Sequence, residues 1–205
     1  MLGDLFEYWA GDDALVEDVH AQAVVGAFHA LSQTGTMVGI MHGNRDFLIG
    51  QDFALVAGAT LLPDPVEVLA GDRRVLLTHG DDLCTDDLAY QDFRRQVRNP
   101  AWQKTFLAQP LEARRSQIEA LRMRSEAEKS TKLEAIMDVN HEAVRDLIRA
   151  HRFPQLLIHG HTHRPGMHDL QIDGHHCTRW VLGDWGETGD YLRLDESGCT
   201  RHLIS

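Results

Sequence analysis

Alternate histidines occupy the stretch His159-Gly160-His161-Thr162-His163-Arg164-Pro165. An apolar run over 153–158 precedes it, and the length and bounding turn residues of that run predict a buried strand. Histidines two apart at a strand end can leave the sheet together through a glycine-permitted turn and present two imidazoles to one point, which suits a metal ion. The alternative is a polar loop that is rich in histidine because the chain contains 13 of them.

Three other apolar runs end in polar residues that could serve the same chemistry: Gly3-Asp4, Gly43-Asn44-Arg45-Asp46 and His79-Gly80. Each is ordinary by itself, since Asp4 and Asn44 are common turn residues and a single strand-end histidine is more often not a ligand. An asparagine oxygen can nevertheless complete the coordination shell of a hard metal ion, and Arg45 can bind a phosphate through two parallel N–H donors. The four strand ends together are far more specific than any one of them.

Hydrophobic periodicity predicts the elements that must position these strand ends. Repeats at three and four predict an amphipathic helix over 14–33, and further helices are predicted over 47–59, 88–97 and about 140–150. Asp86 or Asp87 could cap the helix over 88–97. Short apolar runs predict strands over 37–41, 66–69, 74–77, 153–158, 166–172, 177–182, 191–194 and 200–204, of which the second and third form a hairpin around Gly71-Asp72.

The composition is that of a globular protein with one domain: 205 residues, 43% hydrophobic and 25% charged. The formal net charge of -11 argues against a general nucleic-acid binder. No apolar run is long enough to span a bilayer and no secretory signal opens the chain, so we expect a cytosolic protein. Three cysteines, an odd number without metal-site spacing, predict reduced thiols.

A basic segment interrupts the acidic chain, because residues 94–132 carry ten Lys/Arg against four Glu. With prolines at plausible helix starts, it predicts a peripheral helical insertion over about 87–135 that faces an anionic partner. Trp102, Phe106, Leu107 and Leu111 could either dock the insertion or expose an apolar face to an acyl chain or membrane surface. Ser125, Lys129 and Lys132 share one face if the helix persists, although a solvated charge row would look the same.

The joint pattern resembles the calcineurin-like metallophosphoesterases, and most closely their family of pyrophosphatases that act on UDP-2,3-diacylglucosamine in lipid A biosynthesis. The motifs that carry this resemblance are GDLFEYW (3–9), MHGNRDFL (41–48), LTHGDDLCTDD (77–87), HGHTHRP (159–165) and LGDW (182–185). The resemblance implies an α/β fold with two stacked mixed sheets flanked by helices and a helical insertion. It also implies a dinuclear metal centre at the strand ends, typically of manganese, for which a mixed oxygen and imidazole set is suited.

The family's functional residues map onto this sequence one by one. The resemblance implies that Asp4 bridges two metals, that Asn44, His79 and His161 complete the second, and that His163 serves the first. Arg45 lies where many members of the superfamily carry a histidine acid, and in this family the arginine contacts the phosphate, so Arg45 and Asn44 are the expected catalytic residues. The substrate-binding residues that the resemblance implies are Asn44, Arg45, Asp87, Ser125, Lys129, Lys132 and His161.

The implied reaction is hydrolysis of the pyrophosphate of UDP-2,3-diacylglucosamine, in which metal-bound hydroxide attacks the phosphorus on the UMP side. The products would be UMP and 2,3-diacylglucosamine 1-phosphate (lipid X). The enzyme would work at the cytoplasmic face of the inner membrane as a peripheral protein, without nucleic acid or an obligate protein partner. Two alternatives are a metallophosphoesterase with a soluble phosphoester or nucleotide substrate and a non-catalytic remnant.

One departure from the family pattern concerns the N-terminus. The family begins with a strand that ends in Asp-x-His and supplies the remaining ligands of the first metal, and this sequence has no counterpart of it. We therefore expect the first strand to be absent and the chain to be N-terminally incomplete, through a misassigned start or a deletion. At most one manganese would then bind well, and activity would be impaired.

Overall fold

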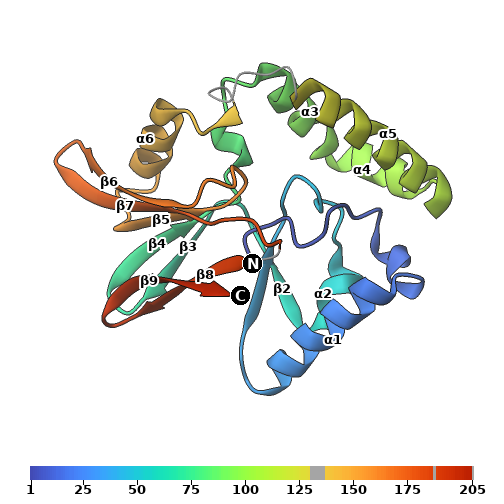
Figure 1. The fold of residues 1–205 in the computed structure, drawn as a ribbon, viewed down its shortest axis with the longest axis horizontal. Helices are drawn as coiled ribbons and strands as arrows, with labels where there is room; N and C mark the ends of the chain where they lie inside the picture. The colour runs from blue at the N-terminus through green and yellow to red at the C-terminus, as the bar shows by residue number, and fades with distance from the viewer. Residues whose placement is uncertain (130–136, 187, 205) are drawn as a thin grey trace. The chain divides into compact units, whose positions relative to one another are not determined.

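The computed structural model describes residues 1–129, 137–186 and 188–204. This part of the chain has the mixed α/β fold that the sequence predicts, and it divides into two compact units (Figure 1). The first unit contains Met1, Gly3–Leu62 and Asp87–Glu134, and the second contains Leu2, Pro63–Asp86 and Ala135–Ser205. Neither unit is one continuous segment of chain. The single domain expected from the sequence stays a prediction.

The first unit combines a pair of parallel strands with helices. Its elements are the 3₁₀-helix η1 (Asp12–Val16), α1 (Val19–Gln33), β1 (Val38–Met41), α2 (Gln51–Ala57), β2 (Ala59–Leu62), α3 (Leu88–Val97), α4 (Pro100–Leu107) and α5 (Leu111–Lys129). The backbone of Met1 adds to the free edge of β1, since its N–H donates to Gly39 O at 2.8 Å and its carbonyl accepts from Met41 N at 3.0 Å. Asp4 therefore follows strand-like backbone, as the sequence predicts.

Aromatic side chains form the core of this unit. Phe6 stacks on Trp9 at 4.9 Å between ring centroids, and both meet the edge of Phe53. The insertion contributes to the same core, because Phe106 is buried and stacks on Trp102 at 4.8 Å. Of the two roles left open by the sequence, docking is the one that Trp102 and Phe106 perform.

The second unit is built on a five-stranded mixed sheet in the order β3-β4-β5-β7-β6, with a separate antiparallel pair, β8-β9. β4, β5 and β7 run parallel, and β3 and β6 pair antiparallel at the two edges. The elements are β3 (Val66–Ala70), β4 (Arg73–Leu77), η2 (Asp81–Leu83), α6 (His141–Ala150), β5 (Leu156–His159), β6 (Gly166–Ile172), β7 (His175–Val181), β8 (Gly189–Asp195) and β9 (Gly198–Ile204).

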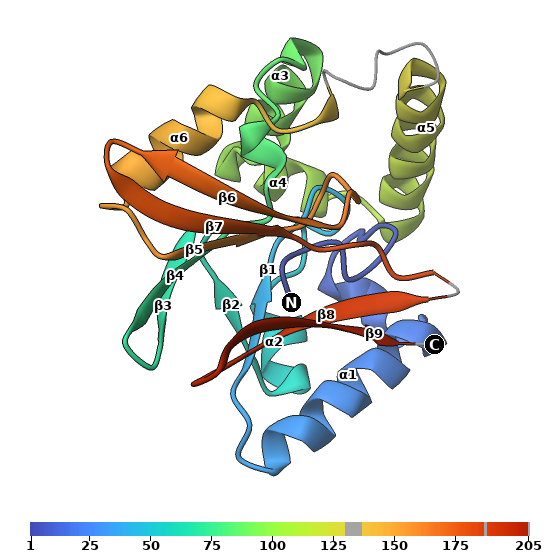
Figure 2. The same ribbon diagram turned by 60° about the vertical axis from the view of Figure 1, so that its left-hand side comes forward.

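Both faces of this sheet are covered, and successive side chains of each strand point to opposite faces. Leu76 and Leu157 pack on the same cluster as Val144 and Ile148 of α6. On the other face, residues of β4 and β5 pack with residues of the β8-β9 hairpin, namely Val75, Leu156, Ile158, Leu192 and Leu194. Figure 2 shows α6 and the hairpin on opposite sides of the sheet. Two sheets are thus stacked within this unit, as expected, although only the five-stranded sheet is mixed and β8-β9 is antiparallel.

Two predicted helices are shorter in the structure. The helix expected over 14–33 begins only at Val19, where the Asp18 carboxylate caps it by accepting from Ala21 N at 2.9 Å. The helix expected over 47–59 is α2 alone, because Gly58 adopts φ 63° and ends it in a left-handed cap. Ala59 instead starts β2, a strand that the sequence analysis missed because four residues carry too little periodicity.

Side-chain caps begin two further helices. Asp87, one of the two caps that the sequence offers for the helix over 88–97, accepts from Tyr90 N at 3.1 Å at the start of α3. Asn140, where the sequence places the approximate start of the last helix, caps α6. Pro100 is the first residue of α4, as predicted.

Within the described residues, no helix combines the length and the apolar character needed to cross a bilayer.

Candidate active site

The predicted site residues are distributed over both units. Asp4, Asn44, Arg45 and Asp87 belong to the first unit, and His79, His161 and His163 belong to the second. Ser125 and Lys129 lie on α5, but their side chains fall outside the described structure, as does the whole of Lys132. Their expected contacts with a substrate stay predictions.

In the first unit, Asp4 and the loop after β1 interlock. Asp4 adopts a left-handed backbone with φ 55°, and its Oδ1 accepts from Arg45 N at 3.0 Å. Gly43 faces Asp4 so closely that a Cβ there would collide with Oδ1 and the backbone N of Asp4. The two segments can approach this closely only because position 43 has no side chain.

A buried carboxylate holds these two segments together. Asp46 is fully buried and accepts from the backbone N–H groups of Asp4 at 3.3 Å, Leu5 at 2.6 Å and Gly43 at 2.7 Å. In the sequence Asp46 lies in a predicted polar turn, and no role of its own was expected for it. An acid at the end of a buried strand was the only indication that it would need donors nearby.

Arg45 is fixed on two sides. Its Nε lies 3.6 Å from Asp4 Oδ2, and its NH1 donates to Glu7 Oε1 at 2.7 Å. The other oxygen of the Glu7 carboxylate accepts from NH2 of Arg122 on α5 at 2.9 Å. The guanidinium expected at a phosphate is thus held beside the carboxylate expected at a metal.

In the second unit, His79 leaves the end of β4 as a buried side chain with a defined tautomer. Its Nδ1 lies 2.8 Å from Leu2 O, and because a carbonyl only accepts, Nδ1 carries the proton. In the neutral ring Nε2 then bears the lone pair, which is the form that binds a metal ion. The local structure therefore suits His79 to the role that the family resemblance implies.

His161 lies next to His79. The two ring centroids are 5.1 Å apart, and one ligand nitrogen of each ring lies within 4.8 Å of the other. Gly160 N donates to His79 O at 3.0 Å, which ties the two loops together. His161 and His163 both have left-handed backbones, with φ 61° and 53°, which is uncommon outside glycine. This turn is what releases the histidines from the strand.

His159 and His163 have different surroundings from this pair. His159 is fully buried, and burial lowers the pKa of its imidazole to about 4, so the ring is neutral at physiological pH. Its Nδ1 lies only 2.9 Å from where a Cβ of residue 80 would be, so Gly80 is needed there. His163 Nδ1 lies 3.4 Å from Asp184 Oδ2, in the polar turn that follows β7.

Asp64 is a second acidic residue whose role the sequence analysis missed. Its Oδ1 accepts from Thr78 Oγ1 at 2.6 Å and from His79 N at 3.3 Å, so it anchors the segment that carries His79. Burial raises the pKa of its carboxyl, and the nearby charge of Asp81 raises it further. Asp64 lies 15 residues from His79 in the sequence, beyond the range of any local pattern.

Two arginines at the start of α5 pair with acids of their own unit. Arg114 is buried and donates to Asp13 and Ala10 O, while Arg115 donates to Glu17 at 2.9 Å. The hydrogen bond from Arg114 lowers the pKa of the Asp13 carboxyl. These two arginines therefore attach the insertion to the unit, and the anionic partner expected for the insertion stays a prediction.

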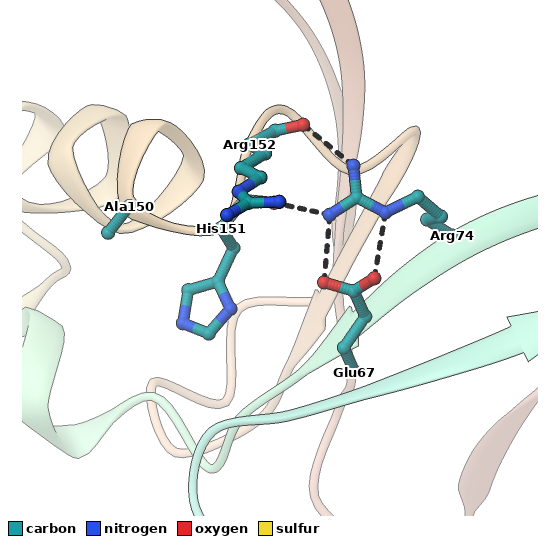
Figure 3. A pocket seen from close by; sticks show the side chains of 5 residues that line it. All are labelled: Glu67, Arg74, Ala150, His151 and Arg152. Carbon is teal, nitrogen blue, oxygen red and sulfur yellow. Dashed lines mark hydrogen bonds and ion pairs between the residues drawn. The ribbon is translucent and has the colours of Figure 1, made fainter.

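A cavity of about 550 Å³ in the second unit contains none of the predicted site residues (Figure 3). Arg74 fills one wall, where Nε and NH2 donate to the two oxygens of Glu67 and NH1 and NH2 donate to the carbonyls of Arg152 and His151. These bonds join the β3-β4 hairpin to the end of α6. The cavity is a structural junction in which Arg74 and Glu67 pair with each other.

Carboxylate, imidazole and guanidinium groups at the strand ends of a mixed α/β fold agree with the metallophosphoesterase class predicted from the motifs. No family model matches the chain. A solved structure of a Vps29 mutant from Entamoeba histolytica aligns with 89% of this chain and 88% of its own, with 12% identity and a TM-score of 0.34, and this weak likeness carries no argument.

Three relatives are informative, each a UDP-2,3-diacylglucosamine hydrolase. Those of Aromatoleum aromaticum, Chromohalobacter salexigens and Stenotrophomonas maltophilia are 53%, 50% and 47% identical to this chain. The alignments cover 97%, 90% and 97% of this chain and 80%, 74% and 82% of the relatives. The chain therefore belongs to the UDP-2,3-diacylglucosamine hydrolase family, and the resemblance inferred from its motifs is confirmed.

Proposed function

We propose that this chain hydrolyses the pyrophosphate bond of UDP-2,3-diacylglucosamine and releases UMP and 2,3-diacylglucosamine 1-phosphate. The observation that carries the proposal is 53% identity over 97% of the chain to a hydrolase of that name. An Arg45 guanidinium that is fixed beside the Asp4 carboxylate supports it, because a rigid fork of donors matches phosphate oxygens.

We propose Asp4, Asn44, His79, His161 and His163 as ligands of divalent metal, with manganese as the expected ion. The donor set supports this, since His79 has the required tautomer and lies beside His161. When bound, such ions lower the pKa of water and neutralise charge on phosphoryl oxygens.

The chain's own groups then bind and orient the substrate. Arg45 donates to the oxygens of the phosphate under attack, where its charge stabilises the negative charge that develops in the transition state. Asp87, Ser125, Lys129 and Lys132 contact the rest of the substrate head. We also propose that the protein binds the inner membrane peripherally through the insertion, on which Leu107 and Met123 are exposed.

Manganese-dependent release of UMP from UDP-2,3-diacylglucosamine tests this function. Replacing His79 or His161 with Ala is expected to lower kcat at least about 100-fold. Loss of a residue that only orients a metal ligand already lowers metal affinity or activity by about 10- to 100-fold, and loss of the ligand itself should cost at least as much. Calorimetric titration with manganese should show weaker binding in both variants. His176→Ala is the control, since this exposed histidine of β7 pairs only with Asp169 among the described residues. Wild-type protein without turnover, or full turnover in both ligand variants, would contradict the proposal.

A further inference from the structure

Glu7 joins two arginines that come from different elements. Its Oε1 accepts from NH1 of Arg45, in the loop after β1, at 2.7 Å, and its Oε2 accepts from NH2 of Arg122, on α5, at 2.9 Å. Each oxygen therefore serves one guanidinium, and the carboxylate lies between two like charges that would otherwise repel each other. All three residues belong to the first unit.

The surroundings of both arginines restrict them further. Nε of Arg45 lies 3.6 Å from Asp4 Oδ2, so Asp4 and Glu7 hold the guanidinium from two directions. The Arg122 guanidinium lies over the ring of Tyr8 at 5.7 Å from the centroid. A free arginine side chain samples many rotamers, and fixing one of them on binding costs conformational entropy. Contacts that already restrict the side chain before the ligand binds reduce this entropy cost for each hydrogen bond to the ligand.

Glu7 contributes little to folding stability by this arrangement. Its side chain is 66% exposed, and exposed ion pairs are weak because water screens them. The hydrogen bond from Arg45 to Glu7 therefore adds little to stability, and its main effect is to fix the direction of the guanidinium. Removing it should therefore change the reaction far more than the melting temperature.

We propose that Glu7 is a positioning residue, which aims Arg45 at the substrate phosphate and couples that aim to α5 through Arg122. The inference rests on the proposed function, since it takes Arg45 as the group that contacts the phosphate. It deepens that function by linking the insertion to the phosphate contact through a named side chain.

The first test is a double-mutant cycle between Glu7 and Arg45, with kcat and KM measured for UDP-2,3-diacylglucosamine and manganese. Glu7→Ala should lower kcat about ten-fold, because small misplacements of a positioning group are costly, while KM and Tm change little. In an Arg45→Ala background the same change should have no further effect, since Glu7 acts only through Arg45. Independent, multiplicative losses would overturn the inference.

Glu17→Ala is the matched control. Glu17 is 62% exposed and accepts from Arg115 NH1 at 2.9 Å, so it also joins the start of the chain to α5 but does not contact Arg45. Its removal should leave kcat unchanged. Equal losses in the two variants would show that general docking of α5 matters and would overturn a specific role for Glu7.

A readout without catalysis separates this inference from the proposed function. Nuclear magnetic resonance relaxation of the Arg45 Nε–H group should give a high order parameter in the wild type that falls in Glu7→Ala and stays high in Glu17→Ala. If the wild type does not hydrolyse the substrate, the proposed function fails and this measurement still decides the role of Glu7. An unchanged order parameter in Glu7→Ala would overturn the inference whatever the kinetics.

Discussion

A carboxylate that is removed from water needs donors in place of its hydration shell, and Asp46 finds them in three backbone N–H groups. Two of these belong to Asp4 and Leu5, and the third belongs to Gly43. One buried side chain therefore sets the spacing between the segment that carries Asp4 and the segment that carries Asn44. Its contribution is to geometry as well as to stability.

Asp46→Asn should lower the free energy of unfolding by about 2–3 kcal/mol. The amide that replaces one oxygen cannot accept, so at least one backbone N–H would be buried without an acceptor, and the charge that strengthens the remaining bonds would be lost. Urea denaturation measures the change. Asp72→Asn, in the exposed turn between β3 and β4, is the control and should change stability by under about 0.5 kcal/mol. Equal effects at the two positions would refute this reading of Asp46.

His79 and His163 share one feature, a protein group beside Nδ1. Leu2 O accepts from His79, and Asp184 lies beside His163. Metal-binding histidines commonly have such a partner on the second ring nitrogen, because it fixes the tautomer and the orientation of the ring. These contacts support the proposed ligands without defining a metal geometry.

At the scale of elements, α5 is attached near its start by one buried cation. Arg114 is 2% exposed and donates to Asp13, to Ala10 O and to Gln109 O. The next residue, Arg115, is partly exposed and bonds only to acids at the surface, Glu17 and Glu112, among the described residues. Adjacent arginines on one helix thus differ mainly in burial.

Arg114→Ala should reduce stability by about 2–3 kcal/mol, since it leaves two carbonyl oxygens without their donor and removes a packed side chain. Arg115→Ala should cost less than about 1 kcal/mol because its ion pairs are exposed. Both values come from denaturant unfolding of the same preparation. If the two substitutions cost the same, burial of Arg114 does not control how firmly α5 is attached.

At the scale of the whole molecule, the path of the chain bears on cooperativity. The first unit draws on residues before and after the stretch Pro63–Asp86, which belongs to the second unit. Neither unit can therefore be completed by one continuous piece of chain. This supports the single domain predicted from the sequence.

We predict one cooperative unfolding transition for the 205-residue chain. Differential scanning calorimetry should give a calorimetric enthalpy equal to the van't Hoff enthalpy, as expected when no intermediate is populated. Two resolved transitions, or a van't Hoff enthalpy near half the calorimetric value, would show that the units unfold separately. The single-domain prediction would then be wrong.

The sequence alone determined the features that depend on near neighbours. Period-two and period-3.6 patterns located most strands and helices, and the cap of α3 was narrowed to Asp86 or Asp87 because a cap bonds within three residues. The motifs at four strand ends identified the family, since residue types at a strand end are visible without coordinates.

Tertiary structure decided the contacts between distant residues. Glu7 and Arg122 are 115 residues apart, and Asp46 reaches Leu5 across 41. No local period encodes such pairs, because they form only when packing of the core brings separate segments together. The same reason explains why Asp46, Asp64 and Glu7 were not assigned roles from the sequence, although each is the residue that holds a predicted site residue in place.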